Sequence, residues 1–369
     1  MQYCIAAVSE FKARINKNVY CFGAGKAFDT FMKKFDGFGL ENHIKAIADN
    51  SPKMLTKVVN NRCIPIISLE QMLDEITDND CILITAAAYE EIIEQLEKIE
   101  RLNSVKYYIY SIMRIEQYDY DRRKINIPLQ LSKYKEIQLP KVIHYCWFGR
   151  KEIPNQYREW MNSWKKYCPD YEIIEWNEDN YDVHKNRYIS QAYDMKKWAF
   201  VSDYARIDII NEYGGVYLDT DVELIKNIDV LLRNDAFCGF ESYQFVAYGL
   251  GFGAKRHNPV LQEIKEYYDS TKFIRDDGTL NQVTCPVIQT EIMKKHGLNC
   301  NGKFQIVDGM TVYPSRVLCG MSPHSFRIMC DPVYTYAIHH FASSWAENNP
   351  WKTVPISRMK KWGRAREGP

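Results

Sequence analysis

Apolar and polar positions alternate along the first hundred residues in a pattern typical of strands separated by helices. Short apolar runs rich in β-branched residues occur at 19–22, 44–48, 64–67, 81–85 and 105–110. The intervening stretches with helical character lie at about 26–35, 69–76 and 90–101. Because strands that alternate with helices usually form a parallel sheet with helices on its faces, residues 1–112 are expected to form a Rossmann-like parallel α/β domain.

The pattern breaks between residues 113 and 140 and then resumes. The segment 113–140 is polar and contains Pro128 and Pro140, which indicates a linker. A second α/β series begins at residue 141, with elements expected at 154–167, 171–176, 196–213 and 216–218. Residues 141–350 are therefore expected to form a second domain, and residues 351–369 a basic C-terminal tail.

The first domain carries a weak dinucleotide-binding fingerprint. Gly23 and Gly25 follow the first apolar run, but Phe28 stands at the third glycine position. Asp49 lies at about the distance expected of a ribose-binding acid. A scaffolding or acceptor-positioning role is favoured, with cofactor binding as the alternative.

Composition narrows the class of protein. The chain has 369 residues, 46% of them hydrophobic, and a formal net charge of +1, which gives no reason to expect a nucleic-acid partner. Its 11 cysteines show no Cys-x-x-Cys pair, which favours reduced thiols. Glu10 interrupts the first apolar run, and no later run reaches the length of a membrane span. We therefore expect a cytoplasmic protein.

The strongest chemical signal is an Asp-x-Asp pair after a buried strand. Gly214 and Gly215 end the long helix, and the run that follows delivers Asp219 and Asp221. Two carboxylates at this spacing suit a hard divalent cation, Mn²⁺ or Mg²⁺, which would neutralise a diphosphate leaving group. The alternative, a solvated turn after a strand, is disfavoured by the buried approach and the double glycine.

Two further segments supply candidate site residues. Asp203 and Arg206 lie three apart on the long helix and so share a face; they form either an intrahelical ion pair or a sugar- and phosphate-binding pair. Near the end of the chain, alternation along a strand separates His339 from His340, and one of them would complete a metal site.

A strand-end tryptophan and a basic tail remain ambiguous. Trp147 stands beside a glycine turn and would stack on a base or pack in the core, whereas His144 is interpreted as a satisfied strand histidine. The tail 351–369 has six Lys and Arg residues against one Glu. It is either solvated or in peripheral contact with the inner face of the plasma membrane.

Three blocks in this order resemble glycosyltransferase family 32: KVIHYCWFG (141–149), SDYARIDIINEYGGVYLDTDVEL (202–224) and HHFASSW (339–345). The resemblance implies a GT-A fold, a divalent metal, and retaining transfer of a hexose or N-acetylhexosamine from a nucleotide-diphosphate sugar, UDP-sugars being favoured. It implies a saccharide or lipid-linked saccharide acceptor, as in capsule or exopolysaccharide synthesis.

The same resemblance assigns roles to individual residues. Asp219 and Asp221 hold the metal with His339 or His340, the spacing favouring His339. Asp203 and Arg206 lie at the donor sugar and Trp147 at the base. Other residues assigned to the donor site are Tyr204, Gly215, Ser344 and Trp345. No isolated carboxylate stands out as a nucleophile, Glu241 being a weak candidate, so front-face attack is expected.

Two other classes of function compete with a transferase. An aspartyl-phosphate phosphotransferase would need Thr or Val at position 223, where this chain has Glu223. A non-catalytic nucleotide-sugar-binding subunit of a polysaccharide assembly complex is disfavoured, because the metal, sugar and base positions all hold competent residues.

Overall fold

The computed structural model describes residues 1–15, 18–34, 39–51, 54–86, 88–242 and 244–342. The chain divides into two compact units, Met1–Asp121 and Arg122–Pro369, and each is described by itself. The boundary falls inside the segment 113–140 that was expected to be a linker. The first part of that segment is helical, because α5 runs from Tyr110 to Lys124. The predicted tail 351–369 lies outside the described residues.

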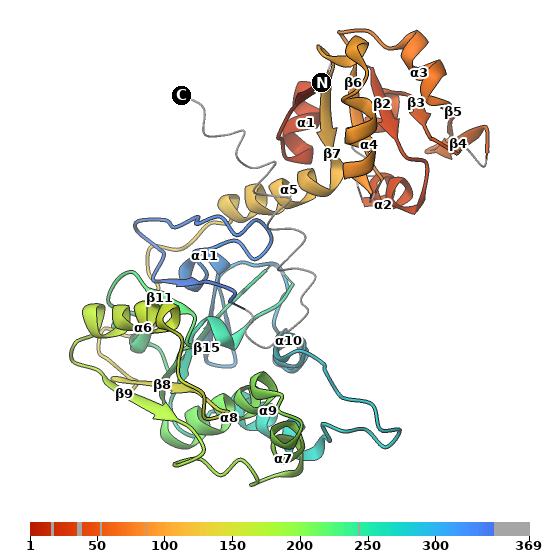
Figure 1. Ribbon diagram of the computed structural model, residues 1–369. Helices are drawn as coiled ribbons and strands as arrows, with labels where there is room; N and C mark the ends of the chain where they lie inside the picture. The colour runs from red at the N-terminus through yellow and green to blue at the C-terminus, as the bar shows by residue number, and fades with distance from the viewer. Residues whose placement is uncertain (16–17, 35–38, 52–53, 87, 243, 343–369) are drawn as a thin grey trace. The chain divides into compact units, whose positions relative to one another are not determined.

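The first unit is built on a seven-stranded sheet in the order β1-β7-β6-β2-β3-β5-β4 (Figure 1). All neighbours are parallel except β4 and β5, as the alternation of strands and helices predicted. The strands are β1 Gln2–Tyr3, β2 Val19–Phe22, β3 Ile44–Ala48, β4 Thr56–Val59, β5 Arg62–Ile67, β6 Cys81–Ile84 and β7 Lys106–Ile109. The helices are α1 Val8–Arg14, α2 Lys26–Lys34, α3 Leu69–Glu75 and α4 Tyr89–Leu96, with short turns η1 Leu40–Asn42 and η2 Glu100–Leu102.

The glycine loop of this unit is held by its own residues. The two carboxylate oxygens of Asp49 accept hydrogen bonds from the backbone N–H groups of Ala24 and Ser51, both at 2.9 Å. Lys57 Nζ donates to the Ala24 carbonyl at 2.6 Å, and Phe28 is 1% exposed in the core. Asp49 therefore serves the loop, and the scaffolding role stays the favoured prediction for this unit.

The second unit contains a mixed seven-stranded sheet and a two-stranded ribbon. The sheet has the order β14-β15-β12-β13-β10-β8-β9, and β11 pairs with β16 in the ribbon. The strands are β8 Val142–Cys146, β9 Glu172–Trp176, β10 Gly215–Tyr217, β11 Val222–Leu224, β12 Ala236–Gly239, β13 Phe252–Ala254, β14 Gln305–Val307, β15 Met310–Tyr313 and β16 Ala337–His339. The helices are α6 Asn155–Tyr167, α7 Arg187–Asp194, α8 Trp198–Tyr213, α9 Pro259–Ser270, α10 Cys285–Lys295 and α11 Ser315–Leu318, with turns η3 Leu231–Arg233 and η4 Tyr248–Leu250.

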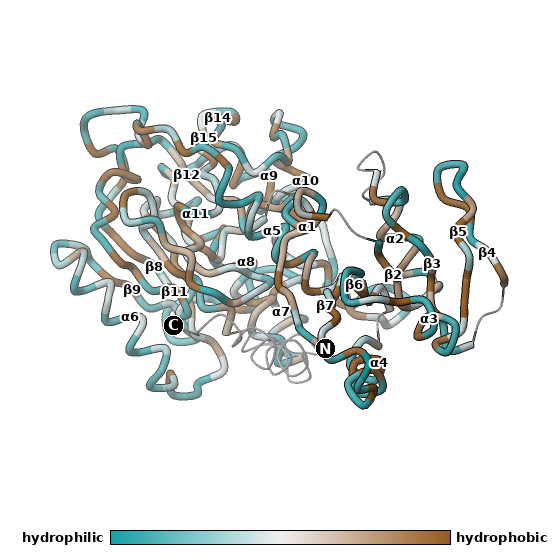
Figure 2. Tube along the Cα trace, turned by 90° about the horizontal axis from the view of Figure 1, so that it is seen from above, coloured by the Kyte–Doolittle hydropathy of each residue, from teal (hydrophilic) through white to brown (hydrophobic). Residues whose placement is uncertain are grey.

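Alternating side chains of the central strands pack against different helices. On β8, Ile143 and Tyr145 join the core cluster that includes Trp164 of α6. Cys146 joins the cluster that includes Val201 of α8. Figure 1 shows where β8, α6 and α8 lie in this unit. In Figure 2, the brown colour of hydrophobic residues marks buried strands of both units: β2 and β3 in the first unit and β8 in the second. The sheet therefore separates an α6 face from an α8 face.

The helix α6 fixes the ribbon beside the sheet. Trp164 Nε1 donates to the Val222 carbonyl at 2.8 Å, and the Ser163 hydroxyl accepts from the Leu224 N–H at 2.8 Å. These bonds reach the strand that directly follows Asp221. Among the described residues, no helix is long and apolar enough to cross a membrane.

Candidate metal and sugar site

The Asp-x-Asp pair forms the turn between β10 and β11. The expected strand 216–218 ends one residue earlier, at Tyr217, and the Val222 N–H donates to the Asp219 carbonyl at 3.0 Å to close the turn. Turn geometry, and not strand alternation, therefore brings the two carboxylates together. The Asp219 and Asp221 side chains are 24% and 12% exposed.

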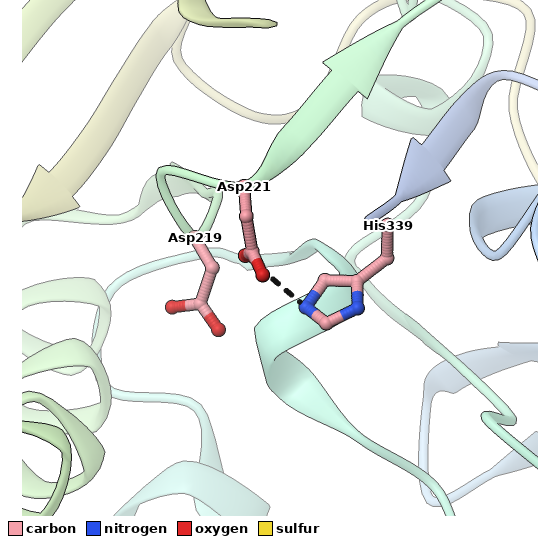
Figure 3. Close-up of side chains that lie close together, drawn as sticks. All are labelled: Asp219, Asp221 and His339. Atoms are coloured by element: carbon pink, nitrogen blue, oxygen red, sulfur yellow. Dashed lines mark ion pairs between the residues drawn. The ribbon is translucent and has the colours of Figure 1, made fainter. Parts of the chain in front are cut away.

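The ribbon brings His339 to this turn from β16. One ligand atom from each of Asp219, Asp221 and His339 lies within 4.8 Å of the others. Figure 3 shows His339 directed toward Asp221, with its Nε2 atom 3.3 Å from Asp221 Oδ1. The side chain of His340, the residue after β16, has other partners. Its Nε2 atom is hydrogen-bonded to a Glu223 carboxylate oxygen at 2.9 Å, and its ring stacks on that of Trp160 with the ring centroids 4.2 Å apart. His339, which the spacing favoured, is thus the histidine beside the carboxylates.

The charges of this cluster fit a divalent cation. Burial raises the pKa of Asp221, but the charge of His339 outweighs it and holds the pKa at about 2. For His339, burial lowers the pKa and the Asp221 carboxylate raises it, with a net rise. Burial also raises the pKa of Asp219, against the effect of Arg206. Two partly buried carboxylates and an imidazole are a donor set that Mg²⁺ or Mn²⁺ accepts.

Asp219, Asp221 and His339 are called the metal cluster below. Arg206 connects this cluster with Asp203. Its Nη2 atom lies 3.2 Å from Asp203 Oδ1 and 3.2 Å from Asp219 Oδ1. The guanidinium lies over the Tyr217 ring at 5.2 Å, and its Nε donates to the Ser202 carbonyl at 3.1 Å. The intrahelical ion pair and the site function that the sequence left open are therefore compatible, because the same arginine serves both.

A glycine that the sequence did not single out forms one wall of the site. Gly249 lies in η4, and a Cβ atom built there would stand 2.3 Å from Asp219 Oδ2 and 3.0 Å from an Arg206 Nη atom. Its φ angle is ordinary for any residue. No spacing rule links position 249 to position 219, so only the fold shows that this glycine must be small.

Trp147 lies away from Asp203 and Arg206. It packs with the α6-face cluster, its ring meets Tyr157 edge-on, and its Nε1 donates to the Lys151 carbonyl at 2.6 Å. It lines a cavity of about 530 Å³ together with Tyr145 and Arg158. Because β8 and β10 are parallel neighbours, Trp147 and Asp219 still follow the same carboxyl edge of the sheet. Base stacking by Trp147 stays a prediction.

Tyr204 and Gly215, which were also assigned to the donor site, make structural contacts of their own. Tyr204 lies about 100° around the helix from Asp203, and its hydroxyl donates to Asp269 on α9 at 3.1 Å. Gly215 begins β10, four residues before Asp219, which is about 13 Å along a strand. A Cβ at Gly215 would meet the Val142 carbonyl and the His144 ring. The donor contacts assigned to Tyr204 and Gly215 stay predictions.

Three further residues were named from the sequence: Ser344, Trp345 and Glu241. Ser344 and Trp345 lie outside the described residues. Glu241 follows β12; burial raises the pKa of its carboxyl group, while the charge of His339 opposes the rise. Neither effect tests Glu241 as a nucleophile, so it stays a weak candidate.

His144 is a fixed structural residue, as the sequence indicated. The Trp176 indole N–H donates to Nδ1 at 3.0 Å, so Nδ1 carries no proton. The protonated Nε2 donates to the Gly214 carbonyl at 3.1 Å. Burial lowers the pKa of His144 to about 4, against the opposing effect of that carbonyl. The histidine holds the double glycine from which the Asp-x-Asp strand starts.

Comparison with known proteins identifies this part of the chain. Residues 154–238, which include Asp203, Arg206, Asp219 and Asp221, match the family model described as the glycosyltransferase sugar-binding region containing the DXD motif. The resemblance to glycosyltransferase family 32 is confirmed. The mixed sheet of the second unit is consistent with the GT-A type of fold that this resemblance implies.

Similar proteins match the chain only in part. Inositol phosphoceramide mannosyltransferase 3 of Schizosaccharomyces pombe is 29% identical over 135 residues, covering 34% of this chain and 36% of that protein. The mannosyl phosphorylinositol ceramide synthase SUR1 of Saccharomyces cerevisiae is 29% identical, covering 43% of this chain and 42% of that protein. The uncharacterized glycosyltransferase L373 of Acanthamoeba polyphaga mimivirus is 24% identical, covering 56% of this chain and 84% of that protein. The chain thus spans well under half the length of the fungal relatives.

Among solved structures, the PaToxG glycosyltransferase is similar with a TM-score of 0.35 and 16% identity. The match covers 49% of this chain and 76% of that chain.

Proposed function

We propose that the chain is a metal-dependent, retaining glycosyltransferase. It would move a hexose or N-acetylhexosamine from a nucleotide-diphosphate sugar to a saccharide or lipid-linked saccharide acceptor. One observation carries this proposal: Asp219, Asp221 and His339 converge within 4.8 Å at the Asp-x-Asp turn of a matched sugar-binding region. His339 comes from β16, far along the chain from the turn that holds Asp219 and Asp221, and a solvated turn would have no need of it.

Each residue of the candidate site has a separate role in the proposed transfer. Asp219 and Asp221 would offer carboxylate oxygens, and His339 a ring nitrogen, to Mn²⁺ or Mg²⁺. When bound, such a cation neutralises the charge that develops on a diphosphate leaving group. Arg206 holds Asp219 in place and adds positive charge beside it. Asp203, on the other side of Arg206, would accept hydrogen bonds from hydroxyl groups of the donor sugar.

Two sources suggest candidates for the donor and the acceptor. The sequence resemblance favours UDP-sugars and polysaccharide synthesis at the cytoplasmic side of a membrane. The names of the fungal relatives add mannose as a candidate sugar and inositol phosphoceramide as a candidate acceptor. We therefore propose a panel that contains UDP-glucose, UDP-galactose, UDP-N-acetylglucosamine and GDP-mannose.

The test is turnover of that panel with Mn²⁺ present. We expect one donor to release its nucleotide, faster with a saccharide acceptor, and EDTA to stop the release. Asp221→Ala should abolish the activity, while Asp170→Ala, which alters an exposed ion pair with Lys141 on the same unit, should retain it. Full activity in EDTA or in Asp221→Ala would overturn the metal-dependent mechanism.

Stereochemistry tests the retaining part of the proposal. We expect the first product formed from an α-linked donor to be α-linked, as NMR of the fresh reaction would show. Front-face attack predicts no sugar on the protein by mass spectrometry. Sugar trapped on Glu241 would replace front-face attack with double displacement, and a β-linked product would contradict retention.

A further inference from the structure

His340, the residue after His339, is held by contacts that lie outside the metal cluster. Its backbone N–H donates to the Asp221 carbonyl at 2.9 Å, which extends the pairing of β11 with β16. Its Nε2 atom lies 2.9 Å from a carboxylate oxygen of Glu223, and because an ionised carboxylate only accepts, the nitrogen donates. The His340 and Glu223 side chains are 13% and 36% exposed, so this bond is partly shielded from water. The two strands of the ribbon are thus tied together by a side-chain bond as well.

Trp160 of α6 covers the ring of His340. The two rings are stacked, with their centroids 4.2 Å apart and their planes 10° from parallel. Trp160, Ser163 and Trp164 are three and four residues apart, so they lie on one face of the helix. Ser163 and Trp164 hydrogen-bond the backbone of β11. One face of α6 therefore holds both sides of the ribbon: β11 through its backbone, and the residue after β16 through its ring.

The ribbon sets the distance between two of the proposed metal ligands. Asp221 directly precedes β11 and His339 ends β16, so the pairing of these strands is what brings the two side chains together. Asp221 Oδ1 lies 3.3 Å from His339 Nε2, and Asp221 Oδ2 accepts from the Ala342 N–H at 2.8 Å. Sliding one strand past the other by a single residue would move His339 by about 3.4 Å, whereas metal–ligand distances tolerate about 0.2 Å. Whatever fixes the ribbon therefore fixes the metal cluster.

We propose that Trp160 and Glu223 are positioning residues: they hold His340 from two sides and thereby keep Asp221 and His339 at the spacing that the cation needs. This role rests on the proposed function, because the metal site is what gives the spacing its importance. Neither residue belongs to the Asp-x-Asp motif or to the metal cluster. Loss of groups that orient metal ligands in this way typically lowers metal affinity by about 10- to 100-fold.

The test is titration of the full chain with Mn²⁺, followed by electron spin resonance, without any donor. We expect Trp160→Ala and Glu223→Ala each to weaken Mn²⁺ binding by about tenfold. Trp160→Phe keeps a flat ring against His340 and Glu223→Gln keeps an acceptor oxygen, so both should stay within about threefold of the wild type. Wild-type affinity in either alanine variant, or a Trp160→Phe variant as impaired as Trp160→Ala, would overturn the proposal.

The matched control is Met161→Ala. Met161 follows Trp160 on α6 and packs against the same hydrophobic cluster that contains Trp164. Its side chain points about 100° around the helix from Trp160. Met161→Ala should therefore lower the melting temperature, as a loss of packing does, and bind Mn²⁺ like the wild type. A loss of affinity equal to that of Trp160→Ala would mean that general damage to α6 is responsible, which would contradict the proposal.

A double-mutant measurement tests whether both residues act through His340. In the His340→Ala background, Trp160→Ala and Glu223→Ala should cause no further loss of Mn²⁺ affinity, because their shared partner is already gone. Additive losses would show that the two residues act on the metal cluster by another route.

Hydrogen exchange tests the same contacts in a protein without bound metal, so that failure of the proposed function and failure of this inference stay distinct. The amides of His340 and Ala342 both donate to Asp221. Mass spectrometry of a peptide spanning residues 336–342 should show faster exchange in Trp160→Ala and wild-type exchange in Met161→Ala. Unchanged exchange in Trp160→Ala would overturn the inference whatever the reaction is. A wild type that binds neither Mn²⁺ nor Mg²⁺ would contradict the metal-dependent function itself.

Discussion

At the scale of single residues, the burial of His144 makes the stability of the second unit depend on pH. Its Nδ1 accepts from Trp176 and its Nε2 donates to Gly214, so both nitrogens are satisfied only in the neutral form. A proton on Nδ1 would oppose the indole N–H. The double glycine before the Asp-x-Asp turn is therefore secured best above the ordinary pKa of histidine.

The first prediction is that the second unit loses stability as the pH falls from about 6.5 to about 4. The folded pKa is about 4, below the unfolded value of about 6.5, so the unfolded state takes up the proton first. The cost grows to about 3 kcal/mol at the lower end of that window, at 1.36 kcal/mol per unit. Urea unfolding followed by tryptophan fluorescence measures it, because all eight tryptophans lie after Asp121.

The matched control is His144→Gln, which has no titratable group. Its unfolding free energy should be lower than that of the wild type at pH 7.5 and should vary less between pH 6.5 and 4. If the wild type and the variant show the same slope against pH, His144 is not the group responsible.

The second prediction concerns Asp203. Asp203→Asn keeps the size of the side chain and removes its charge, so the site exchanges a charged, two-oxygen acceptor for a neutral amide with one acceptor oxygen, while Asp219, Asp221 and His339 are unchanged. We expect transfer to fall by about 100-fold, roughly 2.7 kcal/mol of transition-state stabilisation. Calorimetry with Mn²⁺ and UDP or GDP should show nucleotide binding preserved. An equal loss of nucleotide binding would mean that Asp203 acts only as the ion-pair partner of Arg206.

At the scale of elements, η4 is the segment on which the metal cluster depends most closely. The third prediction is that Gly249→Ala weakens Mn²⁺ binding by more than tenfold, because the added methyl group would stand 2.3 Å from Asp219 Oδ2 and push the carboxylate aside. The φ angle of Gly249 is ordinary, so the change should leave the melting temperature within about 2 °C.

The control is Gly25→Ala, where a Cβ would meet nothing within 4 Å and the φ angle is ordinary. It should bind Mn²⁺ like the wild type, as fluorescence or electron spin resonance titration would show. Wild-type affinity in Gly249→Ala would mean that Asp219 can move without loss of its role.

Most elements could be predicted from the sequence, because their apolar faces follow a clear period. β2, β3 and β6 lie within one residue of their expected bounds, since each is a continuous buried run. The strand β4 was missed because its Val58 side chain is 70% exposed and gives no burial signal. The helix α5 was mistaken for a linker because it is polar, and the prolines that suggested a linker lie beyond Lys124.

Some residues of the candidate site could be predicted from the sequence and others could not. Asp219, Asp221 and Asp203 carry a local motif, and His339 was separated from His340 by strand alternation. Gly249 reaches Asp219 only through packing between segments that lie apart in the sequence, which leaves no periodic trace. Tyr204 and Gly215 were assigned to the donor site through the family resemblance; Tyr204 donates to Asp269 and Gly215 begins β10, and their donor contacts stay predictions.

At the scale of the whole molecule, the two units differ in what they offer a ligand. In the first unit, the glycine loop is occupied by contacts from Asp49 and Lys57. In the second, the carboxyl edge of the sheet carries the metal cluster. A donor should therefore stabilise one unit and not the other.

The fourth prediction follows from this difference. Saturating Mn²⁺ together with the true donor should raise the tryptophan-reported melting temperature, by about 2.7 kcal/mol of stabilisation at 100 times the dissociation constant. The donor without Mn²⁺ should have a smaller effect, and Asp221→Ala should show no response. An equal rise in Asp221→Ala would place donor binding away from the metal cluster.

The position of Arg206 has a consequence for the order in which ligands bind. One guanidinium holds Asp219 and Asp203 at 3.2 Å each, so neither carboxylate can be reoriented without disturbing the other. Under the proposed function, a change that the cation makes at Asp219 therefore reaches Asp203 through the same guanidinium. Thermodynamic reciprocity then requires the donor sugar to change the affinity for the cation by the same factor as the cation changes the affinity for the sugar. The arginine would thus couple the supply of the divalent cation to the use of the donor.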